Sequence, residues 1–292
     1  MTKISWRHHY LPVFYLKGFT KKSNKFKIYD VQNKRFVKDG KDFSPESYFF
    51  KKNDNTISIG DYSDDSLESK YYKKFDNDVA KLINKINSED HSTRHGVDEN
   101  DMPALNHFVS LMYWRLPHKR EELKKIIKNN DLNSLGVSMV DELGISDPEI
   151  EEKFKNSEIF LKGYKFHNSL MDSTRGYNYN CRTPYTIIES SNELPFLCSD
   201  NPVIFEKQNP EVYKDDYLFP LSGTRLFMKT DRREDFPPLL RMMVDTLIFK
   251  QAVKYVSCTD EKHINILEEN FERFNITVEG LKEDIFKRIK VT

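Results

Sequence analysis

The sequence predicts an α+β fold that is predominantly helical, with an N-terminal β-hairpin and a small antiparallel sheet from the middle-to-C-terminal strands. Short alternating segments lie near the N-terminus, and apolar residues recur every three or four positions after residue 64. Strand-like segments then return after residue 182, ahead of the last helices. The 292 residues contain no internal repeat and no long linker, so we expect a single domain over 1–292. Its parts are an N-terminal motif and hairpin (1–50), a helical part (64–172), a strand-rich part (182–230) and C-terminal helices (237–290).

The first regular elements are predicted to be a hairpin and a long helix. Residues 25–37 alternate around a turn at Gln32 and Asn33, a pattern typical of a hairpin. From Asp64 the spacing of apolar residues changes to three or four, which predicts an amphipathic helix. Its buried stripe is expected to consist of Leu67, Tyr71, Phe75, Val79, Leu82 and Ile86.

Three further helices are predicted in the middle of the chain. One begins near Asp101, with a proline in its first turn, and ends at Pro117. Residues 121–129 form a charged helix. Another helix starts at Ser146, where Glu149 completes a capping box, and is expected to run unbroken towards Leu170.

The remaining chain is predicted to return to strands and then to helices. Residues 185–189, 203–206 and 225–229 are short apolar segments separated by turn-forming residues, which is typical of strands. After a pair of prolines, residues 239–256 show helical spacing through Leu240, Met243, Leu247 and Val253. A last helix is expected to begin at Thr259.

Composition and missing motifs exclude several classes of protein. The 46 basic residues balance 46 acidic ones, so no global field attracts the chain to nucleic acid or to an anionic membrane. The first residues contain no apolar signal segment, and no stretch approaches the ~20 apolar residues that span a bilayer. We therefore expect a cytoplasmic protein without a membrane partner. The sequence lacks the phosphate-loop, nucleophile-elbow and zincin motifs of NTPases, dehydrogenases, serine hydrolases and zinc proteases.

His8 and His9 are the first candidates for chemistry. Neighbouring side chains point to opposite faces of a strand, so one ring is expected to face inward and the other outward. Either could transfer protons near neutral pH. The structural alternative is one satisfied core histidine beside an exposed one. Tyr10 and Tyr15 follow, either as core residues or as the lining of a substrate pocket.

Arg115 and Asp200 are the next candidates. Arg115 stands at the predicted end of a helix, where it either interacts with the helix dipole or binds an anion, and the adjacent Trp114 either packs or stacks a base. Asp200 and Asn201 lie in a turn-forming segment between apolar residues. That segment is either a closed turn or a loop that presents the Asp200 carboxylate to a cleft. Glu68, at the edge of the first long helix, is either a surface residue or a partner of a histidine or arginine.

Three of these motifs occur in an order that resembles a bacterial and archaeal family, domain of unknown function 4238. They are HHYLPVFYLKGF at 8–19, YWRLP at 113–117 and SDNPV at 199–203, followed by FPLSGTRLFM at 219–228 and QAVKYV at 251–256. The chain departs from the family pattern at two places. Asp76 stands near the expected second glutamate, and Gly223 replaces a common proline.

The resemblance implies a stand-alone antiphage or toxic effector with nucleic acid as target and a phage-derived trigger. We expect the distant motifs to converge in a cleft of His8, His9, Arg115, Asp200 and Glu68, which would form a nuclease that prefers RNA to DNA. One histidine would act as base and the other as acid, without metal or cofactor. A competing version places a divalent ion among a histidine, Asp200 and Glu68.

Two other hypotheses remain open at this level. The cleft would bind a phage component or a small anionic ligand without catalysis, as a sensor does. Alternatively, the His-His-Tyr and Ser-Asp-Asn-Pro motifs only lock the N-terminus onto the strands through buried hydrogen bonds.

Overall fold

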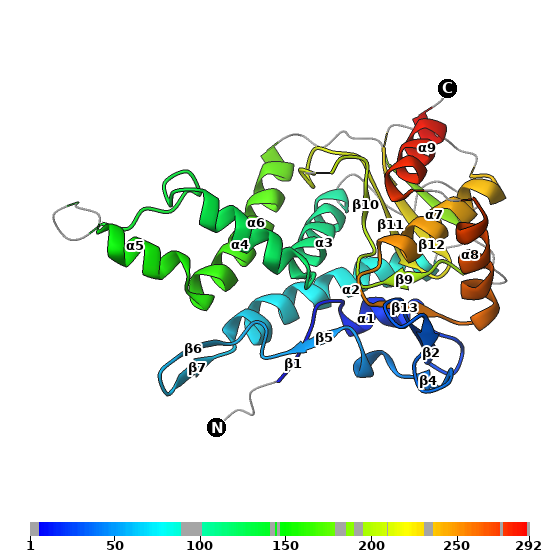
Figure 1. Cartoon of the computed structure of the whole chain (residues 1–292), viewed down its shortest axis with the longest axis horizontal. Coiled ribbons are helices and arrows are strands. Elements are labelled where there is room, and N and C mark those ends of the chain that lie inside the picture. The colour runs from blue at the N-terminus through cyan, green and yellow to red at the C-terminus, as the bar shows by residue number, and fades with distance from the viewer. Residues whose placement is uncertain are drawn as a thin grey trace.

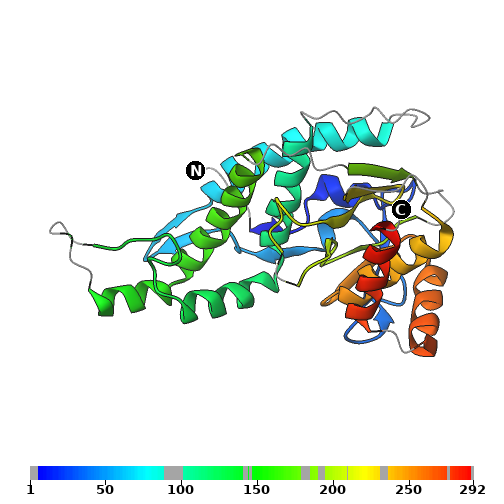
Figure 2. The ribbon, with the colours of Figure 1, turned by 90° about the horizontal axis from the view of Figure 1, so that it is seen from above.

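The computed structural model describes residues 6–88, 101–140, 144, 147–178, 185–189, 195–208, 210–230, 236–274 and 277–290. It confirms the α+β class, with helices packed beside several small antiparallel sheets (Figure 1). Helices α4, α5 and α6 lie at one end of the molecule, and α7, α8 and α9 lie at the other (Figure 2). Among the described residues, none of the helices combines the length and apolar character that crossing a bilayer requires.

The N-terminal motif forms a strand and a short helix. Strand β1 (Arg7–His9) pairs antiparallel with β5 (Phe50–Lys52), and His8 lies opposite Lys51. Helix α1 (Val13–Lys17) follows at Pro12. Strands β6 (Ile57–Ile59) and β7 (Tyr62–Asp64) form a separate hairpin. A short 3-10 helix, η1 (Pro45–Ser47), precedes β5.

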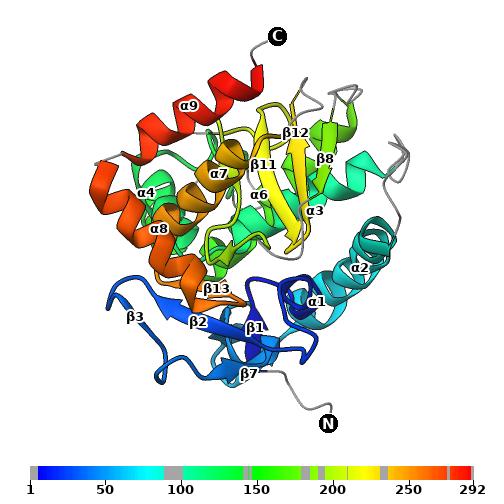
Figure 3. The ribbon, with the colours of Figure 1, turned by 90° about the vertical axis from the view of Figure 1, so that its right-hand side faces the viewer.

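The predicted 25–37 hairpin is confirmed as β2 (Phe26–Asp30) and β3 (Arg35–Phe36). It belongs to a sheet of order β3-β2-β13-β9, in which β4 (Asp42–Phe43) also pairs with β2. Strands β13 (Tyr255–Cys258) and β9 (Cys198–Ser199) come from the C-terminal half of the chain. This sheet therefore joins the two ends of the sequence (Figure 3).

Strand β13 corrects the prediction of a helix over 239–256. Helix α7 (Pro238–Gln251) ends earlier, and Val253 is exposed. Residues 255–258 are bonded on one side to β2 and on the other to β9. A buried central strand with partners on both edges gains more stability from its contacts than one further turn of helix would gain. Helical spacing therefore did not decide the structure here.

The second sheet has the order β10-β11-β12-β8, with antiparallel neighbours throughout. The strands are β8 (Tyr185–Glu189), β10 (Ile204–Phe205), β11 (Tyr217–Ser222) and β12 (Arg225–Lys229). Three of them match predicted segments. Strand β11 was missed because it is continuously apolar and contains Pro220, so it shows no alternation.

The first long helix begins with a π-helical segment, η2 (Leu67–Tyr72), and continues as α2 (Lys73–Ser88). A π-helix closes its hydrogen bonds over five residues instead of four, which rotates the following side chains. Tyr72 is therefore buried, whereas Tyr71 is 58% exposed. The predicted stripe was wrong at Tyr71 and correct at Val79 and Ile86.

The other helices follow the predictions with two corrections. Helices α3 (Met102–Arg115) and α4 (Lys119–Asn129) are as expected. The helix predicted to run unbroken from Ser146 is two helices, α5 (Pro148–Lys155) and α6 (Glu158–Asn178). Asp147 caps α5, whereas the predicted cap Ser146 lies outside the described residues. The Ser157 hydroxyl accepts from the Phe160 amide where α6 begins. Thr259 precedes α8 (Glu261–Phe274), and a further helix, α9 (Val278–Lys290), follows it.

Two apolar cores meet beside the end of α3. The larger core combines both sheets with α2, α3, α7, α8 and α9, and the smaller lies between α4 and α6. Trp114 packs against both cores and donates a 2.7 Å hydrogen bond to Asp172. Arg115, the last residue of α3, is thereby held at the boundary between the two cores.

Candidate functional site

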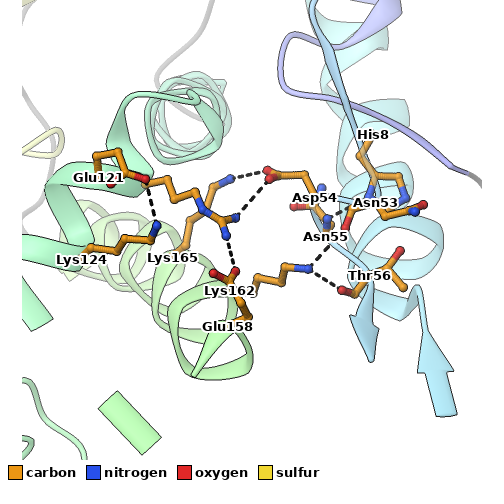
Figure 4. Close-up of polar contacts among 11 residues, drawn as sticks. His8, Asn53, Asp54, Asn55, Thr56, Glu121, Lys124, Glu158, Lys162 and Lys165 are labelled. Atoms are coloured by element: carbon orange, nitrogen blue, oxygen red, sulfur yellow. Dashed lines mark hydrogen bonds and ion pairs between the residues drawn. The ribbon is translucent and has the colours of Figure 1, made fainter. Parts of the chain in front are cut away.

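The turn that connects β5 to β6, residues 53–56, lies at the centre of a polar network. Asn53 has a positive φ of 53°, which turns the chain sharply after β5. The Lys162 ammonium donates to the backbone carbonyls of Thr56 at 2.6 Å and Asn53 at 3.3 Å. Figure 4 shows Asp54 pointing to α6 and Asn55 lying beside His8. The 53–56 turn thus connects the N-terminal motif to the helical end of the molecule.

His8 is the inward histidine of the predicted pair. Its side chain is buried, and its Nδ1 accepts a 2.8 Å hydrogen bond from the Asn55 amide. Because Nδ1 is an acceptor, the neutral imidazole carries its proton on Nε2. The Asn55 side chain donates in turn to Glu68 Oε2 at 2.7 Å. His8 is therefore linked to Glu68 through one asparagine.

The same turn holds a buried ion pair on its other side. Asp54 accepts from Lys165 at 3.1 Å and lies 3.6 Å from Arg120. Burial lowers the pKa of Lys165 below its ordinary value. Burial works to raise the pKa of Asp54, but the neighbouring charge of Lys165 lowers it below its usual range.

Arg115 forms the second part of the site. Its side chain is 2% exposed, and its guanidinium lies 3.8 Å from the centre of the Tyr72 ring. Nη1 donates to both carboxylate oxygens of Asp76, at 3.1 and 3.2 Å. Nε and Nη2 are buried and have no hydrogen-bond partner in the part of the chain that the structure describes. Those two groups form the edge of the guanidinium that binds a phosphate or carboxylate in bidentate fashion.

The two parts are close enough to interact electrostatically. Burial raises the pKa of Asp76, and the charge of Glu68 adds to that effect, although Arg115 opposes it. The Lys165 ammonium is also within range of the Arg115 charge. We refer to His8, Asn55, Glu68, Asp76 and Arg115 as the Arg115 site.

An apolar pocket of about 200 Å³ opens next to the Arg115 site. Its walls come from η2, α2, α3 and α6, and they include Tyr71, Phe75, Leu111, Phe166 and Leu170. Tyr72 lines the pocket, and the Arg115 guanidinium lies over its ring. His107, Lys74 and Asp78 complete the lining. We call this hollow the ring pocket.

His107 contributes an uncharged ring to the wall of the ring pocket. Its Nε2 is buried and makes no hydrogen bond within the described residues, and its ring centre lies 4.2 Å from that of Phe75. Burial, and then the charge of Arg115, lower the pKa of His107 to about 4. The imidazole is therefore neutral at physiological pH.

Replacing His107 by phenylalanine is expected to flatten the acid dependence of stability. The unfolded histidine takes up a proton near pH 6.5, but the folded one does so only near 4. The free energy of unfolding therefore falls as the pH drops through this window, by roughly 3 kcal/mol from this group. Urea unfolding of wild type and His107→Phe between pH 4 and 7.5 measures the difference. Parallel curves would contradict a depressed pKa at this residue.

His9 lies apart from this site. It follows His8 on strand β1, so its ring points to the other face. Its ring centre lies 5.5 Å from that of Phe50, and burial lowers its pKa. The two rings therefore lie on opposite faces of β1, as the alternation of a strand predicts.

Asp200 and Asn201 make contacts that favour the structural alternative for their motif. The Asp200 carboxylate accepts from the backbone amides of Val253 and Lys254 at 2.8 Å, and of Tyr255 at 3.1 Å. Asn201 donates to the Gln251 carbonyl at 3.1 Å. The motif thus fixes the connection between α7 and β13.

The three aromatic residues predicted to bind substrate, Tyr10, Tyr15 and Trp114, pack in or against the apolar cores. Tyr15 is fully buried, stacks on Phe219 and donates to the Pro220 carbonyl at 2.8 Å. Tyr10 is also buried, and Trp114 packs between the two cores. These contacts give the rings a place in the core, which was the structural alternative for each.

Several residues of the Arg115 site and of its surroundings were not predicted. Asn55, Tyr72, His107 and Lys165 carry no motif, and only Asp76 was noted, as a departure from a family pattern. Asp76 proves to be the ion-pair partner of Arg115. Among the described residues, no three histidine, cysteine or carboxylate side chains converge in a geometry that would hold a metal ion.

Comparison with known proteins places the chain in a family. The family model described as protein of unknown function (DUF4238) matches residues 7–262. The chain belongs to this family. The matched range begins at strand β1 and includes His8, Glu68, Arg115 and Asp200, so the resemblance inferred from the motifs is confirmed. No curated protein and no solved structure matches the DUF4238 chain.

Proposed function

We propose that this DUF4238 protein is a toxic or antiphage effector that cleaves nucleic acid, with RNA preferred over DNA, at the Arg115 site in the cytoplasm. The observation that carries the proposal is the Nε–Nη2 edge of Arg115. A buried guanidinium seldom leaves two donors unpaired, because each unsatisfied donor costs about 1–3 kcal/mol. A phosphodiester oxygen pair would satisfy both once the side chains that enclose them move aside.

The carboxylates around Arg115 supply the proton transfers. Glu68, oriented by Asn55, would take the proton from the attacking hydroxyl. Asp76 is paired with Arg115 as a carboxylate, and burial raises its pKa. A phosphate that occupies the guanidinium would weaken this pair, so that Asp76 takes up a proton from solvent and gives it to the leaving oxygen. Arg115 would stabilise the charge that develops on the phosphate.

His8 has a positioning role in this proposal. Its hydrogen bond to the Asn55 amide fixes the 53–56 turn, and through it the Asn55–Glu68 contact. This arrangement replaces the expectation that His8 and His9 act together as base and acid, because the two rings face opposite sides of β1. A phage-derived trigger remains part of the proposal from the family resemblance alone.

Replacing Glu68 by glutamine should stop cleavage while leaving the fold intact. The amide keeps the hydrogen bond to Asn55 but cannot accept a proton, so we expect a loss of about 100-fold or more. Cells expressing each variant are scored for growth arrest, and total RNA and DNA are examined on gels. Asn55→Ala, which frees the Glu68 side chain, should lose about tenfold. Glu279→Gln, on α9 and outside the matched range, serves as control. Full activity in Glu68→Gln would remove this residue from the mechanism.

A sensor or ligand-binding module is the second candidate function. The ring pocket beside Arg115 favours it, since a small apolar pocket with one buried cation suits a compact anionic ligand. The balanced charge of the chain agrees, because proteins that bind nucleic acid nonspecifically are usually basic. Growth arrest with intact RNA and DNA would favour this candidate over the nuclease.

A further inference from the structure

We infer that one face of the β1–β5 strand pair binds single-stranded RNA, with a base stacked on Trp6 and phosphates beside Arg7 and Lys52. This inference deepens the proposed nuclease, on which it rests, by giving the substrate a binding surface outside the catalytic groups. The two strands lie along the lower side of the molecule in Figure 1. We call Trp6, Arg7, His9, Phe50 and Lys52 the Trp6 face.

The strand register brings the side chains of this face together. Arg7 lies opposite Lys52, and His9 lies opposite Phe50. Residues that lie directly opposite each other project to the same side of a strand pair, and alternate residues of one strand do so as well. These four residues therefore share one face, whereas the buried His8 points to the other.

Cations and aromatic rings alternate on the Trp6 face. Trp6 precedes β1, and its ring meets that of Phe50 edge to face at a centre-to-centre distance of 6.0 Å. The Arg7 guanidinium lies 4.6 Å from the centre of the Trp6 ring and 5.1 Å from that of Phe50. The Lys52 ammonium lies 5.2 Å from the Trp6 ring. These cation–π contacts place positive charge beside the surface on which a base would stack.

Exposure and charge indicate the occupant of the face. Trp6 is 44% exposed, although burial of an indole ring is strongly stabilising. Arg7 and Lys52 are exposed as well, and Lys52 forms no ion pair with a carboxylate that the structure describes. The Glu46 carbonyl accepts from Arg7 at 3.3 Å, and the Glu46 carboxylate acts on His9, the last residue of β1.

A single strand of RNA complements this arrangement. Its unstacked bases cover ring faces, and its phosphates neutralise the neighbouring cations. A duplex keeps its bases stacked on one another, so the inferred partner is single-stranded. A lipid surface would need several exposed apolar side chains for insertion, and Trp6 is the one large apolar side chain that this face exposes.

The Trp6 face and the Arg115 site lie on opposite sides of the same strand. His8, in the middle of β1, belongs to the Arg115 site. The Asn53 amide donates to the Trp6 carbonyl at 3.0 Å, which connects the 53–56 turn to the face. RNA bound on Trp6 is thus held next to the turn that positions the proposed catalytic carboxylate.

The first test is the binding of a short, labelled single-stranded RNA to the purified full chain, measured by fluorescence anisotropy. The parent protein carries Glu68→Gln, so that the RNA stays intact. Trp6→Leu, which removes the ring but keeps an apolar side chain, should weaken binding about five- to a hundredfold. Trp6→Phe keeps a smaller ring and should lose less. RNA should also quench the tryptophan emission of the parent protein, and Trp6→Phe should lose that quenching. Thermal melting checks that each variant is folded.

The second test is the salt dependence of binding, which reports the cations. Each phosphate that a protein neutralises on a single strand adds about 0.7 to the slope of log K against log salt concentration, so Lys52→Gln should reduce the slope by about 0.7. Lys287→Gln, which replaces an exposed lysine on α9, is the matched control and should bind as the parent does. A duplex of the same sequence should bind about tenfold more weakly or worse.

The outcomes separate this inference from the proposed function. Undetectable RNA binding, unchanged affinity in Trp6→Leu, or equal binding of the duplex would overturn the inference even if wild type cleaves RNA in cells. Binding that requires Trp6 and Lys52 would support it even if wild type leaves RNA intact, in which case the nuclease proposal fails alone. If vesicles that contain phosphatidylserine bind through Trp6 and RNA does not, the face contacts a membrane and the inference is wrong.

Discussion

Replacing Arg115 by lysine is expected to reduce nucleic-acid cleavage by about a hundred- to a thousandfold. Lysine keeps the positive charge beside Asp76, but its ammonium cannot present the two parallel N–H groups that the Nε–Nη2 edge offers. Losing one preorganised donor to a developing negative charge costs a factor of about 10²–10³ in rate. The measurement is the cleavage rate of a single-stranded RNA, with growth arrest as the readout in cells.

Stability must be measured alongside activity in this variant. Arg115 is 2% exposed and pairs with a carboxylate that burial already disfavours. Removing one partner of a buried ion pair leaves the other charge unpaired and costs about 3–5 kcal/mol. Lysine avoids this cost, because it keeps a cation beside Asp76. Arg288→Lys, in an exposed pair with Asp284 on α9, is the matched control and should have wild-type activity. A folded Arg115→Lys protein with full activity would contradict the proposed function.

Replacing Asp200 by alanine is expected to lower the free energy of unfolding by about 3–5 kcal/mol. Three backbone amides, at 2.8 to 3.1 Å, would lose their acceptor in a buried place. An unsatisfied buried donor costs about 1–3 kcal/mol, and three neighbouring losses are not fully additive. The segment they hold leads into β13, the strand that joins β2 to β9. Chemical denaturation measures the effect directly.

Asp200→Asn separates the structural role from a catalytic one. Burial raises the pKa of Asp200, while the three amide donors act in the opposite direction. Asparagine retains a carbonyl acceptor of the same size, so its stability should lie between wild type and alanine. Asp284→Ala, on the solvent-facing side of α9 where the side chain is 44% exposed, should change stability by less than about 0.5 kcal/mol. An Asp200→Asn protein with wild-type stability and no activity would assign Asp200 to the chemistry after all.

Local sequence patterns predicted the elements whose partners are close in sequence or whose periodicity is simple. The 25–37 hairpin, helix α3 and strand β12 each follow from alternation or from three-to-four spacing. Patterns failed where a distant partner decided the outcome. Residues 255–258 have helical spacing but form a strand, because β2 and β9 offer hydrogen bonds on both edges. Tyr72 became the buried ring instead of Tyr71 because a π-helical segment rotates the register.

The candidate site was predictable only in part for the same reason. His8 and Arg115 were predicted as candidates from motifs and their order along the chain, and Glu68 from its position at the edge of the first long helix. Their connection depends on Asn55, which reaches both His8 and Glu68 and has no sequence signal. Asp200 lies in the Ser-Asp-Asn-Pro motif, yet its carboxylate accepts hydrogen bonds from the backbone of residues 253–255. A motif marks a constrained position, and it does not distinguish a structural constraint from a catalytic one.

The sequence by itself determined the α+β class, most of the helices and the DUF4238 family, because periodicity and short motifs are local properties of a chain. Only the tertiary structure decided which of the polar residues meet. The packing of η2 and α2 against α3 gave Arg115 its neighbours Asp76 and Tyr72. Within the described part of the chain, one edge of its guanidinium stays unpaired. Side-chain hydrogen bonds extend only about 3 Å, so a partner 39 residues away is chosen by the packing of helices and not by spacing in the sequence.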